Sequence, residues 1–299
     1  MKAISYALFG YNKERQENCI DFNSYLRGLM ISIRMNRLIY PEWTTVLNTD
    51  RNTYEAFKDL FDGIWDLEVY INEPEPLCKA MLWRLKPIYL MQEAKDWDKP
   101  RFTHVLCRDL DSPTTYKERQ AVEQWLKDET AIHAITDSES HNIPLMGGMI
   151  GIKTSDWTVR MPKSWNALLE LGRGIDYTRK GTDQLFLTQA VYPVWASKGS
   201  ESITQHYFHG MANTFLNKFY TCNCAKGQNH DSRCLNNTEI NLHNDLREST
   251  FTSGHIGAAG WYSTATSNFL RKYESEFKDL VELEMKYKDI FSWVLNGCY

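Results

Sequence analysis

The chain has 299 residues, 42% of them hydrophobic and 13% aromatic. These values are typical of an ordered globular protein with one large α/β domain or a core with a subdomain, and they exclude a small disulfide-stapled scaffold. The formal charge of −4 provides no global basic field, which argues against tight non-specific binding to polyphosphates such as nucleic acids.

The N-terminus and the cysteines indicate the cellular compartment of the protein. The apolar stretch within residues 1–11 is short and charged residues follow it at 13–15, so we expect neither a signal peptide nor a membrane span. The seven cysteines are an odd number and favour reduced thiols over a disulfide framework. We therefore expect a cytoplasmic protein.

The first part of the chain alternates strand-like and helical patterns, which predicts a parallel, doubly wound sheet. We expect strands at 2–9, 43–48, 67–71 and 102–107, and helices at 23–35, 54–60, 79–91 and 117–127. A turn at 10–12 follows the first strand, and ligands bind at such carboxyl ends in open α/β sheets.

The later part of the chain is less regular. Residues 144–153 form a strand interrupted by glycines, and the pattern at 181–192 is that of a helix with Thr182 as its N-cap. Residues 220–250 lack periodicity and predict an irregular insert, whereas the pattern from 266 to about 291 is strongly helical. We expect a catalytic core at 1–215, and an insert with a C-terminal helical segment at 216–299 that completes a ligand site.

An acidic pair follows the strand predicted at 102–107. Asp109 and Asp111 belong to the run Arg-Asp-Leu-Asp-Ser at 108–112, and two carboxylates at this spacing can hold one hard divalent cation. Mn²⁺ or Mg²⁺ there would bridge the phosphates of a nucleoside diphosphate and neutralise charge on a leaving group. The alternative is a simple turn, because an Asp-x-Asp pair is a weak signal by itself.

The acidic pair is part of a longer set of motifs. Ala-Val-Glu-Gln-Trp-Leu stands at 121–126, Asp137 and His141 lie in a loop, and Pro-Leu-Met-Gly-Gly-Met-Ile-Gly stands at 144–151. Together with 108–112 these segments resemble a set of bacterial and viral glycosyltransferases of the GT-A fold. The family tends to have His and Pro where 138–140 read Ser-Glu-Ser, and a Trp in place of Ile150, so the donor and the acceptor do not follow from the resemblance.

The resemblance implies a fold and a donor site. The fold would be an α/β GT-A fold, with a mostly parallel central sheet flanked by helices, an irregular insert and a C-terminal helix. Gly10 and Tyr11 would lie under the nucleoside, Arg84 and Arg108 would reach the donor, and Gly147 and Gly148 would leave room for the sugar. The alternatives are a turn at Gly10, a surface charge at Arg84 and a β-bulge at the two glycines.

Two acids are candidates for catalysis. Asp183 can act as a general base or orient hydroxyls of the sugar or the acceptor, although an acid in the first turn of a helix is also stabilised by the helix dipole. Asp137 is its rival. The stereochemical course, inverting or retaining, stays open.

A late segment, 255–262, resembles the C-terminal elements that complete the metal site in several GT-A enzymes. His255 would be the third metal ligand, and Gly257 and Gly260 would present backbone N–H groups to the pyrophosphate. His206 and His209 compete with His255 for the ligand role. The alternative is a glycine-rich turn with an exposed histidine.

Four soft ligands gather in the predicted insert. Cys222, Cys224, His230 and Cys234 could hold a structural zinc, which would stabilise a segment with little core of its own. A single residue separates the first two cysteines, which is not a usual zinc spacing, so reduced loop cysteines are the alternative.

The sequence thus favours a metal-dependent glycosyltransferase, hexosyl or pentosyl, that moves a sugar from a nucleoside-diphosphate sugar to a hydroxyl. The acceptor would be a glycan or, since some relatives are viral, a hydroxylated base in phage DNA within the host cytoplasm. A metal-dependent phosphohydrolase or nucleotidyltransferase with the same acidic pair is the second hypothesis. A non-catalytic protein that binds sugar nucleotides or glycans is the third.

Overall fold

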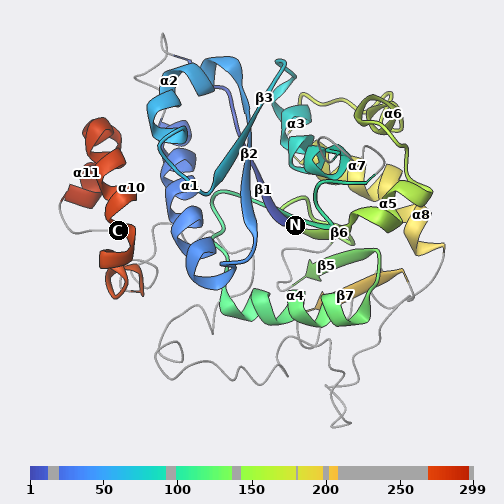
Figure 1. Cartoon of the computed structure of the whole chain (residues 1–299). Helices are drawn as coiled ribbons and strands as arrows, with labels where there is room; N and C mark the ends of the chain where they lie inside the picture. Colours follow the sequence, from blue (N-terminus) through green and yellow to red (C-terminus); the bar gives the residue numbers. More distant parts are fainter. Residues whose placement is uncertain are drawn as a thin grey trace.

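A seven-stranded sheet lies at the centre of the protein (Figure 1). The computed structural model describes residues 1–12, 20–91, 99–136, 143–179, 181–197, 202–207 and 269–295. The strands are β1 (Lys2–Leu8), β2 (Thr44–Asp50), β3 (Leu67–Asn72), β4 (His104–Arg108), β5 (Ile132–Thr136), β6 (Met149–Lys153) and β7 (Ile203–Tyr207).

The strand order is β3-β2-β1-β4-β6-β5-β7. The pairs β3–β2, β2–β1, β1–β4 and β5–β7 are parallel, and β6 runs antiparallel between β4 and β5. The expected α/β fold class, with a mostly parallel sheet flanked by helices, is therefore confirmed. The short strands β5 and β7 were not predicted, and β6 begins at Met149 because residues 143–148 form bends and a turn.

Helices cover both faces of the sheet (Figure 1). They are α1 (Ile20–Ile39), α2 (Arg51–Phe61), α3 (Leu77–Ala80), the 3-10 helix η2 (Met81–Tyr89), α4 (Tyr116–Asp128), α5 (Thr154–Arg160), α6 (Trp165–Glu170), α7 (Thr182–Phe186), the π-helical turn η3 (Leu187–Val191) and α8 (Tyr192–Ala196). The C-terminal segments are η9 (Glu274–Phe277), α10 (Lys278–Glu284), η10 (Met285–Tyr287) and α11 (Lys288–Leu295).

Two hydrophobic layers hold the helices on the sheet. One joins the sheet to α1, α2, α4 and the C-terminal helices, and its largest members include Trp125, Tyr40 and Phe61. The other joins the opposite face to η2 and to α5 through α8, with Trp157 and Trp195 stacked at 6.4 Å. Because both faces are covered, β1 is buried along most of its length, as expected for an interior parallel strand.

Three helical predictions are corrected by the structure. The helix expected at 79–91 is mostly a 3-10 helix with Pro87 inside it, and the proline removes one N–H donor from the helix interior. Gly181, with φ of 85°, is the N-cap of α7, and Thr182 is the first helical residue. The single C-terminal helix is broken into four short segments, and Phe291 has non-helical φ and ψ within α11.

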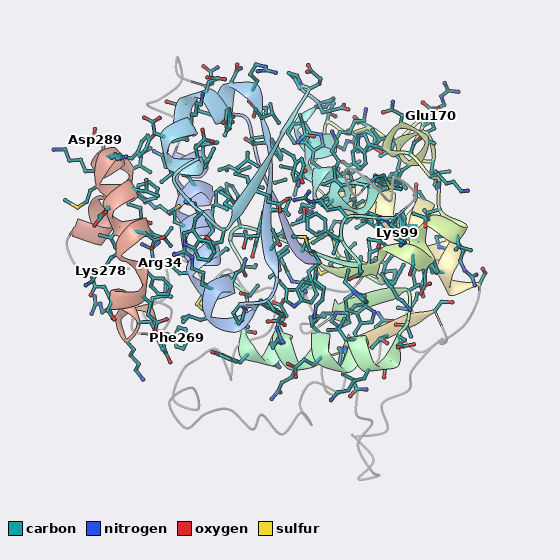
Figure 2. The ribbon with its side chains drawn as sticks, viewed as in Figure 1. Arg34, Lys99, Glu170, Phe269, Lys278 and Asp289 are labelled. Atoms are coloured by element: carbon teal, nitrogen blue, oxygen red, sulfur yellow. The ribbon has the colours of Figure 1, made fainter. Side chains whose placement is uncertain are left out.

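The C-terminal helices pack against α1 and α2 (Figure 1). The guanidinium of Arg34 on α1 donates two hydrogen bonds of 2.7 Å to Glu284 on α10, and both side chains are fully buried. Figure 2 shows Arg34 on the side of the molecule where the C-terminal helices lie. Arg37, one turn further on, binds Asp66 and Asp279. These contacts attach residues 269–295 to the core; whether the 216–299 region completes the ligand site stays a prediction.

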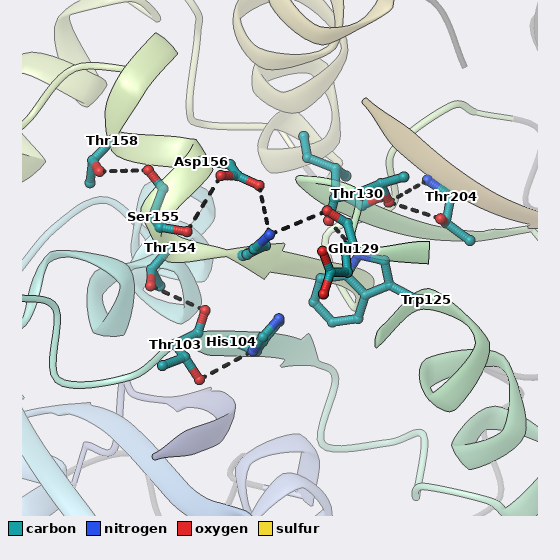
Figure 3. Close-up of polar contacts among 12 residues, drawn as sticks. Thr103, His104, Trp125, Glu129, Thr130, Thr154, Ser155, Asp156, Thr158 and Thr204 are labelled. Carbon is teal, nitrogen blue, oxygen red and sulfur yellow. Dashed lines mark hydrogen bonds and ion pairs between the residues drawn. The ribbon is translucent and has the colours of Figure 1, made fainter. Parts of the chain in front are cut away.

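A set of polar contacts lies around the start of β4, the end of β6 and the start of α5 (Figure 3). The hydroxyl of Thr154 donates to the carbonyl of Phe102 at 2.6 Å, and Thr130, just before β5, shares a hydrogen bond of 2.8 Å with Thr204 on β7. Lys153 pairs with Asp156 at 3.3 Å. These contacts surround His104, the first residue of β4, and therefore stabilise the end of that strand away from the acidic pair.

No helix among the described residues is long and apolar enough to cross a lipid bilayer.

Candidate active site

The acidic pair lies where β4 leaves the sheet. Strand β4 ends at Arg108, and Asp109 and Asp111 follow in a turn in which the N–H of Ser112 donates to the carbonyl of Asp109 at 3.3 Å. The Asp109 side chain is 35% exposed and Asp111 is half-buried. Both carboxylates therefore keep access to solvent at the carboxyl end of a central strand, where open α/β sheets bind ligands.

Arg84 joins Asp109 to Asp183. Its guanidinium donates one hydrogen bond to Oδ1 of Asp109 and a second, of 2.9 Å, to Oδ2 of Asp183, while Nε donates to the carbonyl of Met81 at 3.0 Å. Arg84 is 4% exposed. The structure thus brings together side chains from η2, the end of β4 and α7, and two acids share one buried cation.

The paired glycines are required by this cluster. A Cβ on Gly147 would lie 2.5 Å from Nη2 of Arg84 and 2.7 Å from Oδ2 of Asp183, and a Cβ on Gly148 would overlap the Asp109 carboxylate. The two glycines therefore make room for the charged side chains of the protein. Whether a sugar also uses this space stays a prediction.

One oxygen of the Asp183 carboxylate has no hydrogen-bond partner among the described residues. This oxygen is Oδ1, and the residue is 1% exposed. Burying a carboxylate oxygen without a donor costs free energy. A ligand hydroxyl or an ordered water would satisfy this acceptor, so the geometry is that of a carboxylate prepared to receive a hydrogen bond.

A cavity of about 730 Å³ lies beyond the carboxyl ends of β1 and β2. Trp83, the neighbour of Arg84, forms part of its wall, and its indole Nε1 has no hydrogen-bond partner among the described residues. The remaining lining residues are Phe9, Gly10, Tyr11, Asn12, Asp50, Asn52, Glu55, Ala56, Pro74 and Glu75. Rings and carboxylates suit a flat ligand with N–H or O–H donors, and the acids disfavour a phosphate inside the cavity.

Asp50 shapes the cavity at the ends of β1 and β2. Its carboxylate accepts hydrogen bonds from the N–H of Gly10 at 2.7 Å and from the N–H of Thr53 at 2.9 Å, which also caps α2. The N–H of Tyr11 donates to the hydroxyl of Thr53 at 3.1 Å. Gly10 has φ of 84°, which favours glycine. The predicted turn at 10–12 therefore lies at a cavity.

Two residues of this region, Asp50 and Trp83, were not predicted to lie at a site. Asp50 follows the predicted strand by two residues and precedes a helix, which is the signal of an N-cap. Trp83 lies within the helix predicted at 79–91, whose pattern gives no sign of a cavity. Its place in the wall depends on the edge-to-face contact with Phe9 at 5.4 Å, which joins distant segments.

Arg108 does not belong to the cluster, and its predicted role in donor binding is corrected. The side chain is 2% exposed, and Nε donates to the equally buried Glu118 at 2.8 Å. Nη1 donates to the carbonyls of Cys107 and Ile150. Burial, the largest single influence, lowers the pKa of Arg108, but Glu118, Tyr40 and Tyr6 together raise it above its usual value. The residue is a buried cation that ties β4 to α4.

The thiols beside the cluster are protonated at neutral pH. Burial raises the pKa of Cys107 to about 12, although Arg84 and Arg108 lower it. Its Sγ donates to the backbone carbonyl of Arg84 at 3.3 Å. Burial also raises the pKa of Cys78, and Asp183 adds to the effect. A thiolate nucleophile is therefore absent from these two positions at pH 7.

His206 is not a metal ligand at the acidic pair, contrary to one of the alternatives. It lies on β7, is 2% exposed, and its Nδ1 is 3.0 Å from Nε2 of His133. His133 stacks on Trp125 at 5.3 Å, and burial lowers its pKa well below 6.5. In the sheet, β6 and β5 lie between β4 and β7.

Several candidates lie outside the described residues. They are Asp137 and His141, the metal ligands His255 and His209, the glycines Gly257 and Gly260, and the zinc candidates Cys222, Cys224, His230 and Cys234. Their roles stay predictions.

Asp109 and Asp111 could supply two carboxylates to a hard divalent cation. Nowhere in the described ranges do three or more His, Cys, Asp or Glu side chains gather as a complete metal site. Mg²⁺ commonly uses one or two carboxylates and completes its shell with phosphate oxygens and water. Asp109 and Asp111 are partly exposed; whether they bind such a cation together with a phosphate stays a prediction.

Comparisons with known proteins find similarity at the level of solved structures. No family model and no curated protein matches the chain. Among solved structures, the chain is similar to the crystal structure of the glycosyltransferase GlyE of Streptococcus pneumoniae TIGR4, with 13% identity and a TM-score of 0.41. The match covers 62% of this chain and 42% of that one, so the present chain spans less than half of its length.

Proposed function

We propose that this protein is a glycosyltransferase that moves a hexosyl or pentosyl group from a nucleoside-diphosphate sugar to a hydroxyl acceptor. The observation that carries the proposal is the cluster of Asp109, Arg84 and Asp183, together with the cavity at the ends of β1 and β2 that Trp83, the chain neighbour of Arg84, lines. A sugar nucleotide has a flat base, a charged diphosphate and a polyhydroxyl sugar, and the region offers a complementary surface for each.

The base and ribose would occupy the cavity. Its aromatic walls and its carboxylates at Asp50, Glu55 and Glu75 suit a heteroaromatic ring and ribose hydroxyls. The same carboxylates repel phosphates, which would therefore extend out of the cavity, past Trp83, towards Arg84 and Asp109.

The diphosphate would lie over the acidic pair. Mn²⁺ or Mg²⁺, bound by Asp109, Asp111 and the phosphate oxygens, would supply Lewis-acid stabilisation of the departing nucleoside diphosphate. Arg84 provides a further positive charge beside Asp109. Because Arg84 is held by Met81 and Asp183, its charge is already oriented when the donor binds.

The sugar would contact Asp183. The unpartnered Oδ1 can accept a hydrogen bond from a sugar or acceptor hydroxyl, while Oδ2 stays bound to Arg84. Because Arg84 fixes its orientation, the Asp183 carboxylate would orient this hydroxyl group. In an inverting reaction it would also accept the proton of the acceptor hydroxyl.

Incubation of the full chain with Mn²⁺ and a panel of sugar nucleotides tests the proposal. We expect release of a nucleoside diphosphate, and thermal stabilisation by the matching diphosphate, that depend on Mn²⁺. Asp109→Asn should reduce release by about 100-fold or more, and Glu123→Gln, an exposed acid on α4, should not.

The outcomes separate the hypotheses. Release of inorganic phosphate or pyrophosphate would support the phosphohydrolase or nucleotidyltransferase instead. Donor binding without turnover on any glycan or hydroxymethylated DNA acceptor, and without donor hydrolysis, would support a binding protein. Absence of binding to every nucleoside diphosphate would overturn the proposal.

A further inference from the structure

Gly28 occupies a buried position in the interior of α1. Glycine there is unfavourable: alanine would stabilise a helix interior by about 1 kcal/mol. The helix has 20 residues, and the buried positions next to Gly28 carry large side chains such as Leu26, Leu29 and Met30. A glycine at such a position indicates that a neighbouring group approaches the helix backbone.

The neighbouring group is the backbone between the two metal-site acids. A Cβ on Gly28 would overlap the carbonyl oxygen of Leu110, and it would lie 2.9 Å from the carbonyl carbon of Leu110 and 3.7 Å from the amide nitrogen of Asp111. These are backbone atoms, which cannot rotate away as the end of a side chain can. The Leu110–Asp111 peptide therefore lies directly on α1.

The loop continues along the same helix. The Leu110 side chain is 4% exposed and belongs to the core layer formed with α1. Further on, the hydroxyl of Thr114 donates to Asn36 of α1 at 3.0 Å. On the other side of the loop, Asp109 is bound by Arg84 and lies so close to Gly148 that a side chain on Gly148 would overlap it.

We propose that Gly28 is a positioning residue for Asp111. The absence of a side chain at this point of α1 sets the depth at which the Leu110–Asp111 peptide rests, and thereby the separation of the two carboxylates that face the cation. The inference rests on the proposed function, because it assumes that Asp109 and Asp111 bind Mn²⁺ or Mg²⁺ together with a nucleoside diphosphate.

Gly28→Ala tests this role in the full chain. We expect the affinity for Mn²⁺, titrated calorimetrically in the presence of a nucleoside diphosphate, to fall by about tenfold or more, because shifts near 1 Å disrupt positioned ligands. Helix propensity alone would instead stabilise the protein and leave Mn²⁺ affinity unchanged. That result would overturn the positioning role.

Gly63→Ala is the matched control. A Cβ on Gly63 would lie 2.5 Å from the side chain of Leu283 on α10, so the variant also adds crowding, but at the C-terminal helices. We expect a loss of thermal stability with unchanged Mn²⁺ affinity. An equal loss of Mn²⁺ affinity in both variants would show that crowding anywhere weakens the site, and would contradict a specific role for Gly28.

A double-mutant cycle with Asp111→Asn adds a readout that a purely structural role would not change. If Gly28 acts through Asp111, its substitution should have little further effect on Mn²⁺ affinity once the carboxylate has been removed. Additive effects of the two changes would contradict the proposal.

If Gly28→Ala does not fold, Leu110→Ala tests the same positioning role. It loosens the loop from α1 without adding an atom, and we expect a several-fold loss of Mn²⁺ affinity; unchanged affinity would overturn the proposal. A wild-type protein that binds neither Mn²⁺ nor any nucleoside diphosphate would overturn the proposed function itself, whereas full binding by Gly28→Ala would overturn the positioning role alone.

Discussion

Arg84 donates a hydrogen bond of 2.9 Å to Asp183, a residue 99 positions later in the chain, and the same guanidinium binds Asp109. A single buried cation therefore holds two acids that the chain brings in from different elements. The stability of the protein and the geometry of the site depend on the same contact.

Arg84→Gln should reduce both stability and turnover. Removal of the cation leaves the buried Asp183 without its charged partner, which typically costs about 3–5 kcal/mol. We expect a lower midpoint in urea and a loss of nucleoside diphosphate release greater than that caused by the stability change alone. Arg173→Gln, in a largely exposed pair with Glu170, is the control and should change neither quantity.

Gly148→Ala should displace Asp109. A methyl group at this position overlaps the Asp109 carboxylate, and overpacking of this kind costs about 1–3 kcal/mol. We expect weaker Mn²⁺-dependent stabilisation by a nucleoside diphosphate in a thermal melt. A variant with wild-type stability and a wild-type response to Mn²⁺ would show that the two groups do not touch in solution.

Glu284→Gln should release the C-terminal helices. The substitution leaves Arg34 buried and fully charged without its carboxylate, so the free energy of unfolding should fall by about 3–5 kcal/mol. Replacing both partners, as Arg34→Met with Glu284→Leu, should recover most of that loss. Equilibrium unfolding in urea measures both variants; equal instability of the single and double variants would contradict this account of the pair.

His104 should make the fold sensitive to acid. Burial lowers its pKa to about 4, and Lys2 and Lys153 contribute. Below pH 6.5 the unfolded chain takes up a proton that the folded protein does not, so stability is lost as the pH falls from 6.5 to about 4 and is unaffected above that range. The full shift corresponds to about 3 kcal/mol, an upper bound because the ring is partly accessible.

His104→Gln should therefore flatten the dependence of unfolding free energy on pH between 4 and 6.5. Some slope should remain, because burial also lowers the pKa of His133 and that residue is unchanged in the variant. Urea melts at several pH values measure both curves. An unchanged slope would mean that His104 protonates equally in the folded and unfolded chains.

The sequence predicted the strands of the first half and the acidic pair well. Strands β1 to β4 and helices α1, α2 and α4 lie close to their predicted positions, because each is a long apolar run or a regular amphipathic pattern. The five-residue strands β5 and β7 were missed. Such short runs are stabilised by pairing with neighbours in the sheet, and a local pattern does not reveal that pairing.

The side-chain partners required the tertiary structure. Arg108 and Arg84 are both arginines next to apolar segments, yet Arg108 binds Glu118 in the interior and Arg84 binds the two acids. The direction of each side chain depends on which face of β4 or η2 meets which neighbour. Gly28 could have been noticed as a glycine within a helical pattern, but the reason for it, the Leu110 carbonyl, lies 82 residues further along the chain.

The sequence by itself determined the α/β class, the order of the early elements and the placement of Asp109 and Asp111 at the end of a buried strand, because periodicity and turn residues are local properties. Only the tertiary structure decided that Arg84 joins Asp109 to Asp183, that Gly147 and Gly148 make room for them, and that Gly28 seats the loop between the acids. These are contacts between segments far apart in the chain, and they are selected by close packing in three dimensions.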